Sequence, residues 1–172
     1  LRAVQKDVGV ALAVIEPKEV LDTMEKCPKS ILCGNPWAVL VLMRRLFTWR
    51  QIPKMLELKN MLIGYVKKST ELSDTEKGDI LGECDLIMSF LCYNDILAMS
   101  ALHRSASRQM SGPAMSIRTY GSWTFGSPSV LMMFHREPGK LPEELAAMNE
   151  SMPYYYRITD GHGQGAELLM QA

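Results

Sequence analysis

Signals for the start of a helix recur along this chain, and each is followed by apolar residues at helical spacing. Pro17 opens the first such segment, and apolar residues then fall on one face of a helix, as expected for an amphipathic helix. Pro28 and Gly34 punctuate its end. The sequence therefore predicts a helix from Pro17 that buries a stripe made of Val20, Leu21, Met24 and Cys27.

Two more helices are predicted next. Asn35 can cap free backbone amides, and Pro36 suits the first turn, where no donor is needed. The stretch 37–49 is apolar almost all round until Arg44, which favours burial between neighbours. Pro53 opens the following helix, and the short link between the two favours antiparallel packing. Its expected inward residues are Met55, Leu58, Leu62 and Tyr65.

Ser73 to Glu76 has the pattern of a capping box, in which hydroxyl and carboxylate satisfy each other's backbone amides. Gly78 and Gly82 lie one turn apart and leave a bare groove for close approach of another helix. Asn94 and Asp95 offer the next cap, for a helix running to about residue 110. The inward residues expected on these two helices are Leu81, Cys84, Met88 and Leu91, then Ile96, Met99 and His103.

The strong starts at Asn35 and Ser73 lie roughly 38 residues apart, near the period of tetratricopeptide and other helical repeats. We therefore expect an all-α fold of antiparallel helix pairs, stacked as a tetratricopeptide-like superhelix with one irregular connection. The expected plan is a leading segment 1–16, helical-repeat pairs 17–110, an irregular aromatic loop 111–127, and further helices 128–172 that lead into a truncated next repeat.

The predicted loop begins where Ser111, Gly112 and Pro113 break the preceding helix, and no helical stripe can be drawn through 111–127. A helix resumes at Ser127–Pro128, with Val130, Leu131 and Phe134 inward, and ends at 137–139. Another starts at Pro142, runs through Leu145, Met148 and Met152, and is expected to stop at Pro153.

Charge, cysteine spacing and apolar run length give no indication of a nucleic-acid-binding, disulfide-bonded or membrane-spanning protein. The 19 basic residues balance the 19 acidic ones, so no global charge attracts nucleic acid or anionic lipid. The four cysteines form no CxxC pair, and we expect reduced core thiols. No apolar run approaches the roughly 20 residues that span a bilayer. We expect a cytoplasmic, non-membrane chain. Because it opens at Leu1 rather than a methionine and closes at Ala172 within an uncapped helix-like run, we also expect an internal piece of a longer protein.

Four stretches resemble the central helical region of large, ATP-binding LuxR-type transcription regulators related to the maltose-regulon activator. They are ILCGNPWAVLVLMRRLFTWRQIPKML at 31–56, SFLCYNDILAMSALHR at 89–104, WTFGSPSVLMMFHREPG at 123–139 and MPYYYRITDGHGQGAELLM at 152–170. The resemblance covers roughly residues 17–172. It implies a position between an N-terminal ATPase module and a C-terminal helix-turn-helix domain.

This chain has no GxxxxGK[ST] phosphate loop and no basic recognition-helix segment. ATP is therefore expected only in the missing N-terminal module, and DNA contact only through the missing C-terminal domain. The partner expected for this segment is a small-molecule effector or a protein, with self-association possible. The resemblance assigns no ligand-binding residue to any position here.

Aromatic and arginine residues are concentrated in the segments where the helical pattern is interrupted. Such side chains are suited to bind a sugar, a nucleotide base or a peptide. The alternative is that they plug the superhelix where a long connection crosses it. The candidates are Arg118, Tyr120, Trp123 and Phe125, with Tyr155 and Arg157.

Histidines supply the other candidates. His162 lies in GHGQG, where glycines allow either an anion contact or a tight turn between helices. His135 and Arg136 fall at a helix end, where they serve as a ligand contact or complement the helix dipole. No HExxH motif and no nucleophile paired with a base is found, so we expect no catalytic residue and no metal site.

These expectations combine into a non-catalytic regulatory segment that binds an effector and shifts a regulator between closed and assembly-competent states. The alternative is a free-standing scaffold of helical repeats that binds partner proteins. A third reading, a small enzyme, would require His135 and His162 to lie together beside a pocket.

Overall fold

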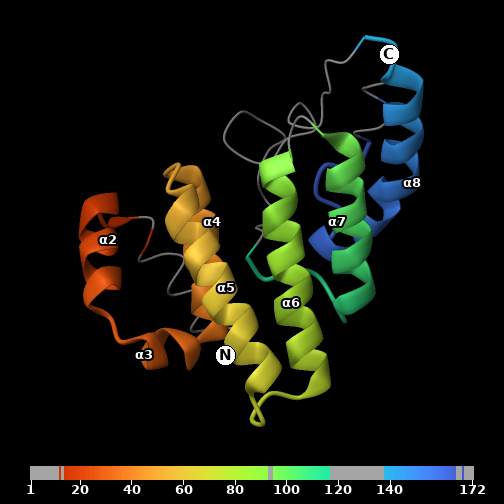
Figure 1. Cartoon of the computed structure of the whole chain (residues 1–172). Coiled ribbons are helices and arrows are strands. Elements are labelled where there is room, and N and C mark those ends of the chain that lie inside the picture. Colours follow the sequence, from red (N-terminus) through yellow and green to blue (C-terminus); the bar gives the residue numbers. More distant parts are fainter. Residues whose placement is uncertain (1–11, 13, 93–94, 117–137, 166–167, 169–172) are drawn as a thin grey trace. The chain divides into compact units, whose positions relative to one another are not determined.

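A computed structural model gives the structure of the chain and describes residues 12, 14–92, 95–116, 138–165 and 168 (Figure 1). Every regular element among them is a helix, and no strand occurs in these ranges. The predicted all-α class is confirmed. The superhelical stacking and the boundaries at 16, 110 and 127 stay predictions. The chain divides into two compact units, residues 1–80 and 81–172, with the boundary inside one helix.

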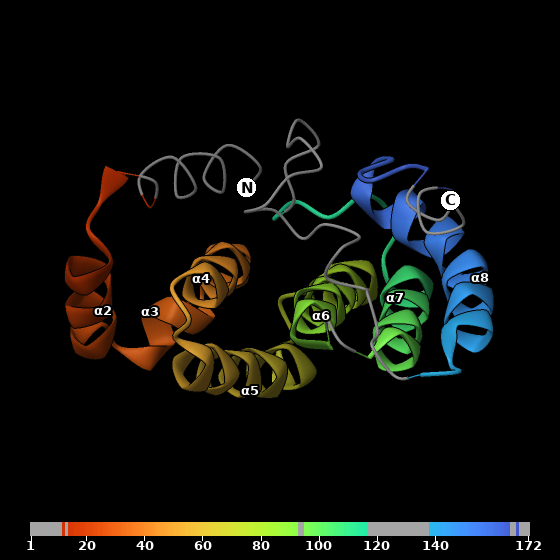
Figure 2. The same cartoon turned by 90° about the horizontal axis from the view of Figure 1, so that it is seen from above.

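The first unit contains α2 (Pro17–Lys26), α3 (Lys29–Cys33), α4 (Pro36–Thr48), α5 (Ile52–Lys68) and the first turns of α6 (Asp74–Ser89). α4 packs against α5, and α3 contacts both (Figures 1 and 2). The burial expected for 37–49 is confirmed only on one side of α4, which carries its buried residues, because the apolar residues Trp37, Val41 and Phe47 are half-buried. The core of this unit includes Val39, Leu40, Leu42, Met43 and Leu46 from α4, with Met55, Leu58, Leu62 and Val66 from α5.

The proline starts of α2, α4 and α5 are confirmed, but three local predictions are wrong. The side chain of Asn35 does not cap α4; its amide instead donates to the carbonyl of Ile31, 2.9 Å away, at the end of α3. The short helix α3 occupies the segment expected to be only a helix end. In α5, Val66 is buried and Tyr65 is half-buried, since the buried stripe turns one position later than its spacing suggested.

The second unit contains most of α6, a 3-10 turn η1 (Phe90–Cys92), α7 (Ile96–Gln109) and α8 (Leu141–Thr159). The caps expected at the start of α6, in the first unit, and at the start of α7, in the second, are confirmed. The amide of Ser73 donates to Glu76 Oε2 at 2.9 Å, and the amide of Glu76 donates to Ser73 Oγ at 3.2 Å. Asp95 accepts the amide of Ala98 at 2.9 Å at the start of α7.

α6 and α7 form an antiparallel pair. Asp85 on α6 contacts Ser105 and Gln109 on α7, whereas Ser89, one turn further along α6, contacts His103. At Gly82 the helices touch, and an added Cβ would lie 2.4 Å from Met110 Cγ and 2.9 Å from the Ala106 carbonyl oxygen. The close helix approach predicted at this glycine is confirmed.

α7 and α8 pack side by side in the same direction (Figures 1 and 2). Ser100 Oγ donates to Ser151 Oγ at 3.0 Å near the start of the contact. Further along both helices, Arg157 donates to Ser107 Oγ at 2.9 Å. The ascending order on both helices makes the pair parallel. The buried residues of these helices include Met99, Ser100, His103, Ala106 and Ser107 of α7, with Met148, Ser151, Met152, Tyr155 and Ile158 of α8.

α8 does not stop at Pro153 as predicted; it continues six residues further to Thr159. A proline inside a helix removes one backbone hydrogen bond. Pro153 and Asn149, the residue one turn earlier, are both exposed, so solvent can reach the carbonyl affected. The buried face of α8 continues beyond the proline, and its packing against α7 offsets the loss.

The stripe expected on α6 is also wrong in part: Cys84 is buried, but Leu81, Met88 and Leu91 are only half-buried. The helix buries a broader face that includes Leu86, Ile87 and the carboxyl side chain of Glu83. All four cysteines are free thiols, and of these only Cys84 is a core residue. None of the described helices has the length and apolar character needed to cross a membrane. The helix predicted from Ser127 lies outside the described residues.

Candidate functional site

The structure places three of the nine predicted site residues. Tyr155, Arg157 and His162 belong to the end of α8 and the turn that follows it. The other six predicted residues lie outside the described residues, and the same holds for any pairing of His135 with His162. These six are Arg118, Tyr120, Trp123, Phe125, His135 and Arg136.

The glycine-rich segment after α8 forms a tight turn, as one of the two sequence-based readings predicted. Asp160 ends the helix in the left-handed conformation at φ 53°, and Gly161, Gly163 and Gly165 also have positive φ, a region that glycine enters without steric cost. The turn folds His162 back into the second unit, where it is 6% exposed. Its Nδ1 lies 2.9 Å from the hydroxyl oxygen of Tyr155.

His103 on α7 completes a buried aromatic cluster with these two residues. Its ring centroid lies 4.7 Å from that of Tyr155. Its Nε2 lies 3.1 Å from Ser89 Oγ, and that hydroxyl donates to the carbonyl of Leu86 at 2.7 Å. Because the hydroxyl has one hydrogen, Nε2 carries the imidazole proton and donates to Ser89. Nδ1 of His103 is then a buried acceptor without a partner in the described part of the chain.

Burial lowers the pKa of His103 from 6.5 to about 3, so the ring is neutral near pH 7. A neutral histidine in contact with a serine hydroxyl has the residue types of a catalytic pair. Yet Ser89 is 0% exposed and His103 is 1% exposed, and a substrate must reach both. The cluster of Ser89, His103, Tyr155 and His162 therefore serves the packing of α6, α7 and α8.

Arg157 does not join this cluster. Its guanidinium donates to the carbonyl oxygens of Ser107 and Met110, the latter at 2.8 Å, and to Ser107 Oγ. These carbonyls belong to the last turn of α7, which lacks intrahelical donors and favours positive charge. Arg157 therefore caps the end of α7, and a ligand contact at this residue stays a prediction.

Sequence reasoning missed two carboxylates on α6. Glu83 is 1% exposed and accepts the backbone amides of Met115, at 3.1 Å, and Ser116. Asp85 accepts from Ser105 Oγ at 2.7 Å and Gln109 Nε2 at 2.8 Å. Glu83 thus fixes the chain just before residue 117. The signal in the sequence was an acidic residue between two apolar positions, Gly82 and Cys84, on the buried face.

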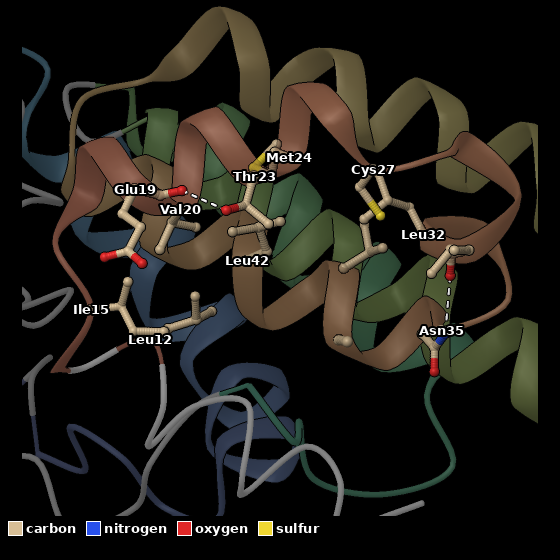
Figure 3. Close-up of a pocket in the computed structure, with 13 residues that line it drawn as sticks. Leu12, Ile15, Glu19, Val20, Thr23, Met24, Cys27, Leu32, Asn35 and Leu42 are labelled. Atoms are coloured by element: carbon tan, nitrogen blue, oxygen red, sulfur yellow. Dashed lines mark hydrogen bonds between the residues drawn. The ribbon is translucent and has the colours of Figure 1, made fainter.

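A more open feature of the first unit was also missed. A groove of about 390 Å³ lies between α2 and α4, and α3 borders one end (Figure 3). We call it the α2–α4 groove. Its lining residues are Leu12, Ile15, Glu19, Val20, Thr23, Met24, Cys27, Ile31, Leu32, Asn35, Ala38, Val39 and Leu42.

The groove has an apolar floor and a partly polar rim. The lining residues Val20, Val39 and Leu42 are buried. Glu19 and Asn35 are exposed and lie near opposite ends of the groove (Figure 3). Pockets of 300–1,000 Å³ with mostly apolar walls and few polar groups are typical small-molecule sites. The arrangement can therefore hold an apolar molecule of modest size.

The sequence predicted the α2 stripe but treated it as core. Val20 is the single buried residue of α2, while Met24 and Cys27 of the same stripe stay half-buried. A second hollow of about 160 Å³ lies between α2, α3 and α5, where Lys54 pairs with Glu25. Met24, Cys27 and Leu32 border both hollows. The apolar face of α2 is therefore only partly covered by its own unit.

Within the described ranges, no group of three or more His, Cys, Asp or Glu side chains is placed to hold a metal ion. Comparison of the chain with protein-family models, curated proteins and solved structures found no match in any of the three.

Proposed function

We propose that this chain is a non-catalytic, effector-binding segment of a transcription regulator of the LuxR type, and that its effector binds in the α2–α4 groove. The observation that carries the ligand-binding role is the groove itself, which has a volume of about 390 Å³ and is lined mainly by apolar side chains. Covering such a surface is favourable by roughly 25 cal/mol for each Å² of apolar area removed from water.

A ligand in this groove would contact α2, α3 and α4 together. α2 buries one residue in the free chain, so its position depends little on the existing core. A molecule that fills the groove adds contacts between α2 and α4 and favours the state in which both are held. In a regulator, that stabilised state would be the one competent for assembly, with ATP and DNA bound by modules outside this chain.

The buried aromatic cluster supports a non-catalytic role, because its histidine and serine are shielded from solvent. Support for the regulator context comes from the resemblance of four sequence stretches. Reading the complete gene tests that context directly. A gene without an upstream phosphate loop and a downstream helix-turn-helix domain would contradict it.

The ligand-binding role is tested by filling the groove. Ala38 lines it from α4, so Ala38→Phe should block an uncharged apolar probe such as N-phenyl-1-naphthylamine. Ala146→Phe, at an exposed position of α8, is the matched control. We expect a fluorescence increase on titration with the wild type and the control, and a loss of at least tenfold in affinity with Ala38→Phe.

Binding to the native state should also raise the melting temperature of the wild type and the control. Equal probe binding by all three proteins, or by none, would contradict the proposal.

A further inference from the structure

The polar side chains along the α2–α4 groove favour some charged ligands over others. Three exposed polar side chains border it, Glu19, Thr23 and Asn35, and the described residues of its lining include no lysine, arginine or histidine. Among these residues, one carboxylate and no cation give the groove a negative charge. An anionic ligand would therefore meet repulsion and find no counter-ion there.

The hydrogen-bond donors along the rim are engaged by the chain itself. Thr23 Oγ donates to the carbonyl of Glu19 at 2.8 Å, and Asn35 Nδ2 donates to the carbonyl of Ile31 at 2.9 Å, both drawn as dashed lines in Figure 3. The thiol of Cys27 points to the carbonyl of Pro28, 3.8 Å away. The side-chain acceptors that remain along the rim are the oxygens of Thr23 and Asn35 and the Glu19 carboxylate, whereas the second hydrogen of Asn35 Nδ2 is the remaining amide donor.

Glu19 supplies the charge at one end of the groove. It lies in the first turn of α2, on the same side as Val20 and Thr23, and Figure 3 shows it beside Ile15. A ligand with an apolar body on Val20, Val39 and Leu42 could place a head group near this carboxylate. A protonated amine is the head group that gains there, because it donates hydrogen bonds and carries the opposite charge.

We infer that the α2–α4 groove binds an apolar amine, a molecule with a hydrocarbon body and a protonated amino group, and that Glu19 receives the amino group. The inference rests on the proposed ligand-binding role of the groove and specifies its chemistry. Carboxylic acids and phosphates of the same apolar size are disfavoured by the same wall.

Three probes of equal chain length separate the contribution of the head group to affinity from that of the hydrocarbon body. They are decylamine, 1-decanol and decanoate, each used below its critical micelle concentration. Their affinities are measured by displacement of N-phenyl-1-naphthylamine from the wild type. Because Glu19 is exposed, its ion pair is expected to favour decylamine over decanol by about fivefold. Decanoate should bind more weakly than decanol, and the amine preference should shrink in 1 M salt.

Glu19→Gln removes the charge, and Glu16→Gln, three residues earlier and not in the lining, is the control. We expect Glu19→Gln to bind decylamine and decanol equally, with decanol affinity unchanged, and Glu16→Gln to behave as the wild type. Equal or tighter binding of decanoate, or an amine preference that survives Glu19→Gln, would overturn this inference while leaving the groove a binding site. Failure of all three probes to bind would overturn the proposed function as well.

Discussion

The hydroxyl of Tyr155 and Nδ1 of His162, 2.9 Å apart, connect the last turns of α8 to the glycine-rich turn that follows it. The ring of His103 on α7 lies against the same tyrosine, at 4.7 Å between centroids. One aromatic side chain therefore contacts both the neighbouring helix and the turn. The path of the chain after Thr159 is thereby tied to the packing of α7 on α8.

Removing the hydroxyl in Tyr155→Phe keeps the ring in contact with His103 but takes a hydrogen-bond partner from the buried imidazole of His162. Loss of a buried hydrogen bond is expected to lower the free energy of unfolding by about 1–2 kcal/mol. Urea denaturation measures it. Tyr154→Phe is the matched control, since Tyr154 is 37% exposed, and should change stability little. Equal effects at both positions would show that the hydrogen bond contributes nothing specific.

His103 should make the fold sensitive to acid. Its pKa is about 3 in the folded chain and 6.5 ordinarily, because burial penalises the charged form. Between these values the unfolded chain binds the proton and the folded chain does not, so stability falls as pH falls from about 6.5 towards 3. The contribution from this residue between pH 6.5 and pH 5 should be roughly 2 kcal/mol.

The measurement is the free energy of unfolding of the wild type and His103→Gln at pH 7 and pH 5. The variant is expected to be less stable at pH 7 but to lose less stability on acidification, which isolates the histidine from the carboxylates that both proteins share. Identical pH dependence in the two proteins would mean that His103 is solvated in the fold.

Local signals in the sequence predicted much of the helical structure. Proline in the first turn predicted the starts of α2, α4 and α5, and the Ser73–Glu76 pair predicted the start of α6. These signals can be found in the sequence because the residues that make them lie within a few positions of one another. The continuation of α8 through Pro153 was not predictable in this way. It depends on packing against α7, a helix distant in the sequence.

The candidate site was harder to predict, because burial depends on tertiary partners. Arg157 looked like a ligand contact from its aromatic neighbours, yet its acceptors lie at the end of α7, about fifty residues away. The Val20–Cys27 stripe looked like core, since its spacing does not reveal how much of that face a neighbour covers. Only the turn role of His162 followed from local chemistry, through its glycines.

Arg157→Lys tests whether this arginine caps α7. A lysine keeps the charge but cannot place several donors in a planar fork around the Ser107 and Met110 carbonyls. We expect a loss of about 1 kcal/mol in unfolding free energy and a reduced circular dichroism signal for helix on heating. Arg108→Lys, at an exposed position in the last turn of α7, should have little effect. If Arg157→Lys is as stable as Arg108→Lys, the planar guanidinium of Arg157 is not needed to cap α7.

Two glycines in helix interiors should respond to alanine in opposite directions. Alanine is favoured over glycine inside a helix by about 1 kcal/mol. Because much of this difference arises from the greater freedom of glycine in the unfolded chain, the same gain is expected at both sites. At Gly64 in α5 nothing lies within 4 Å of an added Cβ, and Gly64→Ala should raise the melting temperature. At Gly82 the new methyl would meet the Ala106 carbonyl oxygen at 2.9 Å, a backbone atom that moves only if α7 moves.

Overpacking of this kind costs about 1–3 kcal/mol and exceeds the gain in helix propensity, so Gly82→Ala should lower the melting temperature. Met110, whose Cγ would lie at 2.4 Å, is flexible and can turn aside, which Gly82→Ala combined with Met110→Ala tests. If the double variant is no more stable than Met110→Ala alone, the helix backbone is the obstacle. Stabilisation by alanine at both glycines would mean that α6 and α7 do not approach as closely as the structure shows.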